Sequence, residues 1–410
     1  MPRLLSVAVL LSGVFALCLA DPKVCSILSY GAKCDNSSDD SPFIQLALDD
    51  LSCTSVLVPA PHMCVSRCLN LSSMSSRALL IESGAQLIVW RTPETYSLTH
   101  ANNMFLSATS GDGSWTGPLL SDFTLSGGGA IVGGGAAWWP KAGSNRPRIL
   151  WIPNGQNISV SNLTFTDSPA WNMGLRGNTI RVENMRLVAG GDSCGGFGHA
   201  PNTDGCNIGG HDIQVRNVFV HNGDDCVPLT TGNDGSTSNV LVENVHCECG
   251  TNGFVIYNQG GTVSGVVAQN LTVVNTNQGA GVKLSRPGKD ASGGLVENIT
   301  WRDVHIQHPR YAALYVNVFQ EDAQPPCTLP KDPALPNWLT VQGLTFQNVS
   351  ATVAQGQAAG CFRCTPGKPC SATFDGVQVV EDGGKTAAPF VCLNFHGKED
   401  GGGSVPHACT

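Results

Sequence analysis

The middle and C-terminal parts of the chain repeat a short phrase in which apolar and polar residues alternate around an asparagine or a glycine. The phrase first reads ISVSNLTF, IRVENMRL, IQVRNVFV, VLVENVHC and VVAQNLTV, and later LVENITW, LTVQGLTF and ATFDGVQV. Alternation with a period of two predicts β-strands, and the central residue predicts a turn that interrupts each of them. The central residues are Asn162, Asn184, Asn217, Asn244, Asn270, Asn298, Gly343 and Gly376.

The spacing of these centres favours one all-β fold over another. Successive centres lie 22, 33, 27, 26, 28, 45 and 33 residues apart, as expected for a solenoid that carries loops of variable length. We therefore predict a single-stranded right-handed parallel β-helix whose asparagines form a side-chain ladder. An all-β sandwich would also explain the strands, but it would leave the recurring phrase unexplained.

Residues 1–20 read as a separate segment. Arg3 precedes an apolar stretch that ends at Ala20, a small residue suited to cleavage. This order is typical of a secretory signal peptide, and the apolar run is short for a membrane anchor. We therefore expect a protein secreted to the extracellular space or a cell wall, with no membrane partner.

The segment after the predicted signal peptide has a helical pattern. Asp39 and Asp40 precede an apolar run made of Phe43, Ile44, Leu46 and Ala47. This run predicts a short helix that caps the first coil, which would otherwise expose an unpaired sheet edge. Because no linker divides the remaining chain, we expect one domain over residues 21–410. Its cap covers about 21–55, and disulfide-rich coils cover about 325–410.

Cysteine usage agrees with secretion. The chain has 17 cysteines, and Cys18 lies in the predicted signal peptide, which leaves 17 − 1 = 16. An even number of this size indicates several disulfides formed in an oxidising compartment. Cys361, Cys364 and Cys370 form a cluster that zinc could bind, but no histidine stands at the spacing of a zinc finger. Glycosylation sequons begin at Asn36, Asn70, Asn157, Asn162, Asn270, Asn298 and Asn348.

The net charge limits the choice of partners. The chain carries a formal charge of −8, and loss of Arg3 with the signal peptide would make it −9. A negative chain disfavours nucleic acid as a partner, although the charge of a local cleft can differ from the net charge. We expect a monomer with no nucleic-acid partner.

Acidic residues gather at two places that lie about one repeat apart. Asp224 and Asp225 stand in the apolar setting of HNGDDCVPL, and Asp204 stands 20 residues earlier in APNTDG. Since adjacent coils stack about 4.8 Å apart, the three carboxylates can meet on one face. Neighbouring side chains of a strand point to opposite faces, so the chain must bend at Asn222-Gly223. A surface turn and a Ca²⁺ site are the alternatives.

Three carboxylates around one space suit the hydrolysis of a glycosidic bond. One of them, whose pKa is raised by repulsion from the others, stays protonated and donates to the leaving oxygen. The others ionise and activate a water molecule.

Together with other motifs, these residues resemble glycoside hydrolase family 28, the polygalacturonases. SYGAKCDNSSDDSPFIQLAL is similar to the opening of that family, and GGGAIVGGGAAWW resembles its glycine-rich phrase. NISVSNLTFTDSPAWNM, PNTDG and NGDDCVPL resemble its later motifs. The resemblance covers nearly the whole mature chain. It implies a right-handed β-helix that hydrolyses an α-linked uronic acid polymer, a pectic polysaccharide, with inversion and without a cofactor.

The resemblance also assigns roles to individual residues. Asp224 would be the general acid, and Asp204 and Asp225 would hold and deprotonate the attacking water. Asn202 would support Asp204. In inverting enzymes the base lies about 6.5–9.5 Å from the acid.

Several motif positions depart from the family pattern. Asn252, or Thr251, stands where the family has a histidine that supports the acid pair, and His246 lies nearby on the preceding strand. Of the arginine and lysine that grip substrate carboxylates, only Lys283 is present. Gly281 replaces the arginine. We expect Lys283, Asn202 and Asn252 to bind substrate. Lysine is a point charge that cannot form the bidentate fork of arginine.

Three further positions can be compared with the family pattern. Arg286 lies close to Lys283, but its odd spacing points it to the opposite side of a strand. Phe319 stands where the family has a tyrosine near the cleft, and Asn172 stands where a histidine is usual.

The carboxylates are therefore present, whereas the groups that bind and orient a uronate are fewer. We predict a hydrolase of α-1,4-galacturonosyl linkages in pectin. Its alternatives are a hydrolase of another pectic glycan such as rhamnogalacturonan, or a weakened β-helix that binds polysaccharide without cleaving it. A lyase is least favoured because it would need a Ca²⁺ cluster and a basic proton abstractor. Sugar stacking or packing could explain the tryptophans Trp138, Trp139 and Trp171.

Overall fold

The computed structural model describes most of the chain after the predicted signal peptide. It covers residues 23–91, 93–96, 104–109, 117–140, 146–191, 194, 199–258, 260–284, 293–318, 339–364, 367–401, 403–407 and 409. The predicted signal peptide, Arg286 and Phe319 lie outside the described residues, as does part of the range 325–410.

The described chain is built almost entirely from strands. The N-terminal strands are β1 (Val24–Ser26), β2 (Asp35–Asp39), β3 (Ser55–Val58), β4 (Met63–Ser66), β5 (Leu69–Asn70), β6 (Ala78–Ile81), β7 (Gln86–Val89), β8 (Met104–Ser107), β9 (Leu120–Ser126) and β10 (Ala130–Val132). The long strands are β11 (Arg148–Thr166), β12 (Met173–Val188), β13 (Cys206–His221), β15 (Ser236–Glu248), β17 (Gly261–Val274), β19 (Gly294–Gln307), β21 (Leu339–Val353) and β23 (Cys370–Glu381). Shorter strands are β14 (Val227–Leu229), β16 (Asn252–Asn258), β18 (Gln278–Leu284), β20 (Ala312–Asn317), β22 (Gly360–Arg363), β24 (Val391–Leu393) and β25 (Phe395–Asp400). The helical elements are η1 (Ile27–Tyr30), α1 (Ser41–Asp49), η2 (Pro93–Thr95) and η3 (Gly135–Ala137).

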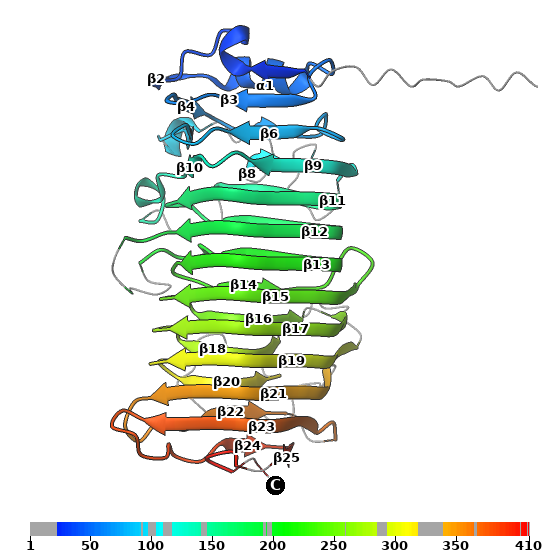
Figure 1. Cartoon of the computed structure of the whole chain (residues 1–410), viewed down its shortest axis with the longest axis vertical. Coiled ribbons are helices and arrows are strands. Elements are labelled where there is room, and N and C mark those ends of the chain that lie inside the picture. The colour runs from blue at the N-terminus through cyan, green and yellow to red at the C-terminus, as the bar shows by residue number, and fades with distance from the viewer. Residues whose placement is uncertain are drawn as a thin grey trace, which may run out of the picture.

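The strands stack into coils along one axis, so the predicted parallel β-helix is confirmed. Every ladder between named strands is parallel, and each pairs a strand with its counterpart one coil away. In Figure 1 successive coils follow one another from α1 at the top of the stack to β25 at the bottom. The long strands form one face, and β14, β16, β18, β20, β22 and β24 form a second. The N-terminal ends of β11, β12 and β13 belong to this second face, because Ile208 of β13 pairs with Leu229 of β14.

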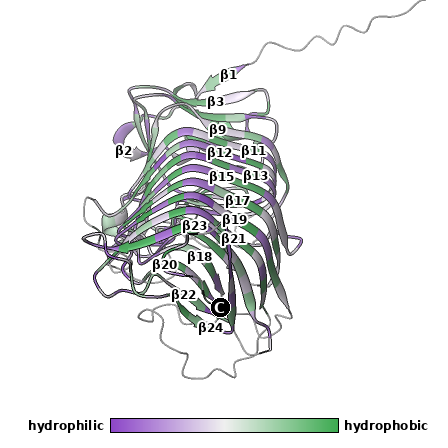
Figure 2. Cartoon of the chain, turned by 60° about the horizontal axis from the view of Figure 1, so that its bottom comes forward, coloured by the Kyte–Doolittle hydropathy of each residue, from purple (hydrophilic) through white to green (hydrophobic). Residues whose placement is uncertain are grey.

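The alternating pattern places stacked apolar rows inside the coils. One row begins with aliphatic residues and ends with aromatic ones, in register across eight strands: Val160, Val182, Val215, Val242, Ala268, Trp301, Phe346 and Phe374. All eight are at most 1% exposed. Figure 2 shows the bands of hydrophobic colour following one another from coil to coil. Burial of such rows supplies the main driving force for stacking.

The predicted asparagine ladder is also present. All eight repeat centres have a positive φ, between 51° and 63°, which asparagine and glycine tolerate better than other residues. Successive side-chain amides are hydrogen-bonded: Asn184 to Asn162 at 3.2 Å, Asn217 to Asn184 and Asn244 to Asn217 at 3.0 Å, and Asn270 to Asn244 at 2.6 Å. The ladder joins the same corner of the five successive coils from Asn162 to Asn270.

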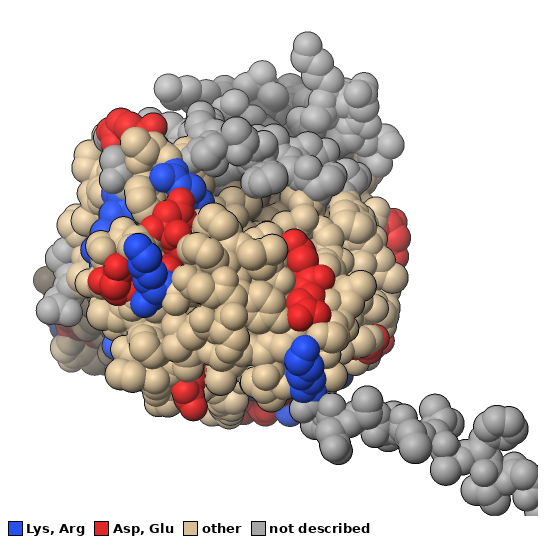
Figure 3. All heavy atoms as spheres, turned by 90° about the horizontal axis from the view of Figure 1, so that it is seen from above, with Lys and Arg blue, Asp and Glu red and all other residues tan. Residues whose placement is uncertain are grey.

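Helix α1 lies at the N-terminal end, as predicted. Ile44, Ala47 and Leu48 are buried, whereas Leu46 is 57% exposed. The helix therefore packs through only part of its apolar run. Viewed toward this end, Figure 3 shows lysine and arginine mixed with aspartate and glutamate, with no large patch of one sign. No described helix combines the length and the apolar character that a membrane span requires.

Disulfides join neighbouring coils and loops. Six are formed among the described residues: Cys25–Cys53, Cys34–Cys64, Cys194–Cys249, Cys226–Cys247, Cys364–Cys370 and Cys392–Cys409. Because Cys364 and Cys370 are bonded to each other, their thiols are not available to zinc. Buried Cys206 is a free thiol in the core.

Candidate active site

Asp204 and Asp225 occupy equivalent positions on adjacent coils. The amide of Gly205 donates to the carbonyl of Asp225 at 2.9 Å, and Ile208 pairs with Leu229 further along. This register puts the two acids side by side just before β13 and β14. Gly205 is required here, because a Cβ would lie 2.3 Å from the carbonyl oxygen of Cys226.

Asp224 joins this pair because the chain bends between β13 and β14. The side-chain amide of Asn222 donates to the carbonyls of Thr203 (2.9 Å) and Asp225 (3.0 Å), which holds the bend from inside. Gly223 is at the bend as predicted, but it has no positive φ, so Asn222 determines the turn more than the freedom of glycine. One carboxylate oxygen from each of the three acids lies within 4.8 Å of the others. The predicted meeting of the three acids is therefore observed.

The next coil supplies two groups that contact the adjacent acids. The hydroxyl of Thr251 lies 2.8 Å from Asp224 Oδ1 and 2.5 Å from Asp225 Oδ1. The amide of Asn252 donates to Asp225 Oδ1 at 2.5 Å. A hydroxyl carries one proton, so Thr251 either shares that proton between the two carboxyl groups or donates it to one of them and accepts a bond from the other, protonated one. The geometry thus suits a site that holds one proton between Asp224 and Asp225.

Lys283 gives the acids their direct countercharge. Its ammonium lies 2.7 Å from Asp225 Oδ2, and the side chains of Lys283 and Asp225 are 20% and 5% exposed. Burial opposes the charge of Lys283, but the interactions with Asp225, Tyr315 and Asp224 together outweigh this and raise the pKa of the lysine. Because a protein cation already neutralises Asp225, the three acids Asp204, Asp224 and Asp225, called the trio below, are a poor match for the Ca²⁺ site considered above.

The three acids do not share one environment. Burial, followed by the charges of Asp224 and Asp225, raises the pKa of Asp204 well above its usual value. Asp204 Oδ2 accepts a bond from Asn207 at 3.0 Å, whereas its buried Oδ1 has no hydrogen-bond partner among the described residues. An unpaired buried oxygen disfavours the charged form. Burial and the charge of Asp225 raise the pKa of Asp224 to about 6.

The residues expected to bind substrate contact the acids themselves. The amide of Asn202 lies 3.3 Å from Asp224 Oδ2, so its observed contact is with Asp224, and Asn207 holds Asp204 instead. The guanidinium of Arg146 donates to Asn202 Oδ1 at 2.7 Å and fixes that amide. Asn252 and Lys283 both contact Asp225, so both belong to the same site as the three acids.

Tyr315 is a part of the site that the sequence did not reveal. Its hydroxyl donates to Asn252 Oδ1 at 2.6 Å, and its backbone pairs with Gly281. A Cβ at Gly281 would lie 2.0 Å from the carbonyl oxygen of Tyr315 and 2.8 Å from its ring. The arginine that the family has at this position therefore has no room here. A tyrosine one coil from a glycine in register is the signal that could have revealed this contact.

His246 and Asn172, two other residues considered where the sequence departs from the family pattern, have structural contacts. His246 on β15 stacks on Phe219, with ring centroids 5.2 Å apart, and bonds Glu248 at 2.7 Å. These contacts belong to the long-strand face, so His246 does not replace the missing histidine. Asn172 is fully buried, and its amide donates to the carbonyls of Thr203 and Asp204. It supports the backbone beneath the trio.

The tryptophans differ in their surroundings. Trp138 is 3% exposed and packs edge-on against Tyr96, which confirms packing for this residue. Trp139 is partly buried, and its indole N–H donates to the carbonyl of Ser168. Trp171 is partly buried and has the guanidinium of Arg148 over its ring, 4.3 Å from the centroid. One face of Trp171 is thus occupied by a cation.

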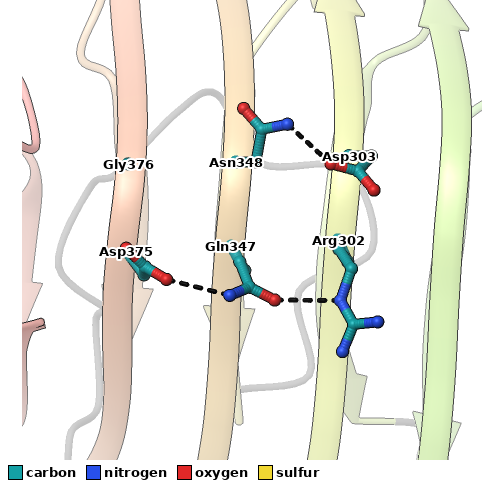
Figure 4. Close-up of a pocket in the computed structure, with 6 residues that line it drawn as sticks. All are labelled: Arg302, Asp303, Gln347, Asn348, Asp375 and Gly376. Atoms are coloured by element: carbon teal, nitrogen blue, oxygen red, sulfur yellow. Dashed lines mark hydrogen bonds between the residues drawn. The ribbon is translucent and has the colours of Figure 1, made fainter. Parts of the chain in front are cut away.

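A polar pocket on the long-strand face is separate from the trio. Figure 4 shows Arg302 and Asp303 of β19 facing Gln347 and Asn348 of β21, with Asp375 and Gly376 of β23 beyond. The side chains bond one another across the strands: Gln347 bonds Arg302 and Asp375 at 2.9 Å, and Asn348 bonds Asp303 at 2.6 Å. These are cross-strand ladders of a solvent-facing sheet.

Comparison with known proteins identifies the family. The model described as "Glycosyl hydrolases family 28" matches residues 97–409, more than half of the chain. The chain therefore belongs to glycosyl hydrolases family 28, and the predicted family is confirmed.

Individual relatives are distant. The chain is 26% identical over 315 residues to a probable endopolygalacturonase A of Aspergillus parasiticus, covering 72% of this chain and 81% of the relative. It is 27% identical over 283 residues to a probable endo-xylogalacturonan hydrolase A of Aspergillus flavus, covering 66% of each.

Solved structures share the fold. An endo-xylogalacturonan hydrolase from Aspergillus tubingensis has a TM-score of 0.72 at 21% identity and covers 93% of this chain and 100% of its own. A polygalacturonase from Erwinia carotovora ssp. carotovora has a TM-score of 0.68 at 17% identity, with coverages of 92% and 97%. The right-handed parallel β-helix is thus shared with enzymes of this kind.

Proposed function

We propose that this chain is a secreted glycoside hydrolase that cleaves α-1,4-galacturonosyl linkages of pectin. The observation that carries the proposal is the trio of acids, with one oxygen from each within 4.8 Å of the others, at the junction of adjacent coils. Membership of family 28 supports hydrolysis of a glycosidic bond, and the names of the relatives support a galacturonan backbone.

Differences among the acids support separate roles. Asp224 is the least buried of the three, and its pKa of about 6 keeps a proton on it in mildly acidic solution. These properties suit a general acid that protonates the leaving oxygen. Asp225 is paired with Lys283 at 2.7 Å and would serve as the base. Asp204, whose pKa is raised well above its usual value, would position the water next to Asp225 rather than deprotonate it alone.

We further propose that hydrolysis proceeds with inversion, as the family resemblance implies. The oxygen separations are shorter than the 6.5–9.5 Å usual between the acid and base of inverting enzymes. An inverting reaction here therefore needs the water to lie beside Asp204 and Asp225 rather than in a wide gap between base and acid. Proton NMR of the first product anomer would distinguish inversion from retention through a covalent intermediate.

Two other functions remain as alternatives. The absence of the family's arginine and histidine favours either a changed pectic substrate, such as rhamnogalacturonan, or a β-helix that binds polysaccharide without cleaving it.

Secretion is supported by the six disulfides among the described residues, because disulfides persist in oxidising compartments. We retain the expectation of a monomer built as one domain.

The test is an assay of reducing ends released from a panel of pectic glycans by the wild type and by Asp224→Asn. We expect release from polygalacturonate or a related pectin, and a loss of about 10²–10⁴-fold in the variant, the usual contribution of a general acid. Equal release by both proteins would refute the role of Asp224. Retention on immobilised pectin with no new ends would instead support the binding function, and ultraviolet-absorbing unsaturated ends would indicate a lyase.

A further inference from the structure

Arg148, at the start of β11, has an unusual setting for a cation. Its guanidinium lies 4.7 Å from the centroid of the Trp151 ring and 4.3 Å from that of the Trp171 ring. Trp151 is 1% exposed, whereas Arg148 and Trp171 are partly buried. The two indoles lie 6.0 Å apart at an angle of 36°. Contacts of this kind hold a guanidinium in place through its faces and leave its N–H edge available for a ligand.

Within the part of the chain that the structure describes, the guanidinium of Arg148 has no hydrogen-bond acceptor. Its recorded contacts are the two rings and an electrostatic interaction with Asp204. Arginine presents five N–H donors in a planar fork that matches a carboxylate. The N–H donors of Arg148 are therefore positioned to bind a carboxylate.

Arg148 stands on the same row of the β-helix as the trio. Leu150, Met173 and Cys206 are in register on β11, β12 and β13. Two residues before each of them stand Arg148, Trp171 and Asp204. The backbone bonds from Ile149 to Trp171 (3.0 Å) and from Asn172 to Asp204 (2.8 Å) continue this register. Arg148 is thus two coils, roughly 10 Å, from Asp204 along the axis.

The other cations that interact with the trio are already engaged. Lys283 is paired with Asp225 at 2.7 Å. Arg146, 7% exposed, donates to the carbonyl of Pro169 at 2.8 Å, to that of Pro201, and to Asn202 at 2.7 Å. The backbone of Tyr315 leaves no room for a side chain at Gly281. Among the described cations with electrostatic contact to the three acids, Arg148 is the one whose charged group has no hydrogen-bond acceptor.

We propose that Arg148 binds the carboxylate of a uronic acid residue of the substrate, about two coils before the trio on the N-terminal side. This inference rests on the proposed function and adds a binding position to it. The uronate-binding arginine, absent from β18, is replaced in function by one on β11, held between Trp151 and Trp171. A polymer lying along the axis places one sugar near the trio and an acidic sugar near Arg148.

The chemistry predicts a preference that can be measured. A free carboxylate accepts two hydrogen bonds from the guanidinium fork, whereas a methyl ester is neutral and accepts more weakly. The enzyme should therefore favour unesterified over methyl-esterified galacturonan at this position. Trp171 acts by positioning Arg148 rather than by offering a free face to a sugar ring.

The experiment measures binding by calorimetry in the Asp224→Asn background, so that turnover does not interfere. The probes are a short galacturonate oligomer and the same oligomer fully methyl-esterified. Arg148→Met should weaken binding of the acidic oligomer by roughly 10- to 100-fold, as expected for loss of a charged hydrogen-bond partner. Binding of the ester should change little. Arg148→Lys, which keeps the charge but not the fork, should lie between wild type and Arg148→Met and remains informative if Arg148→Met fails to fold.

Arg302→Met is the matched control, since Arg302 lies on the long-strand face and bonds Gln347. It should leave both affinities unchanged. Unaltered affinity of the Arg148 variants for the acidic oligomer, or equal weakening for both oligomers, overturns the proposal. The proposed function fails by a different result, the absence of new reducing ends with the wild type on every pectic glycan.

Discussion

Replacement of Lys283 by methionine tests whether the ammonium group controls the protonation of the three acids. The ammonium lies 2.7 Å from Asp225, and the two side chains are only 20% and 5% exposed. At an effective dielectric constant of about 20, the attraction at this distance is about 6 kcal/mol before desolvation. Removing one partner of a buried pair typically destabilises a protein by about 3–5 kcal/mol, because the other charge is left without compensation.

The same change should move the pH profile. Lys283 lowers the pKa of both Asp204 and Asp224 against the burial that raises them. Without it, the pKa values of Asp204 and Asp224 should rise further, and both acids should stay protonated to higher pH. Since about 1.4 kcal/mol corresponds to one pKa unit, the acidic limb of kcat/KM should shift upward by about two units. Initial rates on polygalacturonate between mildly acidic and neutral pH measure this shift.

A second readout separates ionisation from folding. Urea unfolding should show that Lys283→Met loses more stability at pH 7 than at pH 4, because protonation of the acids at low pH removes the uncompensated charge. Lys283→Arg keeps the charge and should retain most of the wild-type profile. A folded Lys283→Met protein whose acidic limb stays at the wild-type pH would refute the electrostatic reasoning.

Three further predictions follow from the same contacts. Thr251→Val removes the hydroxyl that lies between Asp224 and Asp225, so we expect kcat to fall about tenfold, with Thr251→Ser near wild type and KM similar in all three. Equal rates in the valine and serine variants would contradict this role. Tyr315→Phe leaves Asn252 Oδ1 without its donor, which should cost about 1–3 kcal/mol in urea unfolding; an unchanged midpoint would count against it. The pKa of Asp224 is raised to about 6 in the folded protein, so the native state binds the extra proton and loses stability as the pH rises from about 4 to 6, by at most about 3 kcal/mol. Asp224→Asn should flatten that loss and be more stable than wild type at pH 7, as urea midpoints at both pH values would show.

The repeat pattern predicted most of the fold because it records backbone conformation directly. Each central residue adopts a positive φ, and only a few residue types tolerate this region, so Asn162 and Gly343 mark the same corner in coils far apart in the chain. The apolar run predicted helix α1 but not which of its residues are buried, and Leu46 is exposed. A short amphipathic run leaves its rotation open until the first coil is in place to pack against.

The candidate site was predicted in part for similar reasons. Asp204 and Asp225 are linked by the coil spacing, which the repeat supplies. Tyr315 was missed, and Thr251 was named only as the alternative to Asn252 at the position of the family's histidine, since their contacts depend on the register of later coils rather than on any local motif. Asn202 was expected to serve Asp204, but the amide reaches Asp224 instead.

The sequence by itself determined the stacked strands, the asparagine ladder, the family and the three acids, because each follows from residue types in a recurring phrase or a short motif. Only the tertiary structure decided how the acids are charged and what else faces them. Burial and proximity raise the pKa of Asp204 and Asp224, pair Lys283 with Asp225, exclude a side chain at Gly281 and place Arg148 between two tryptophans. These properties arise between coils, where residues distant in sequence share one desolvated space, and electrostatic interactions there depend on separation and burial rather than on order along the chain.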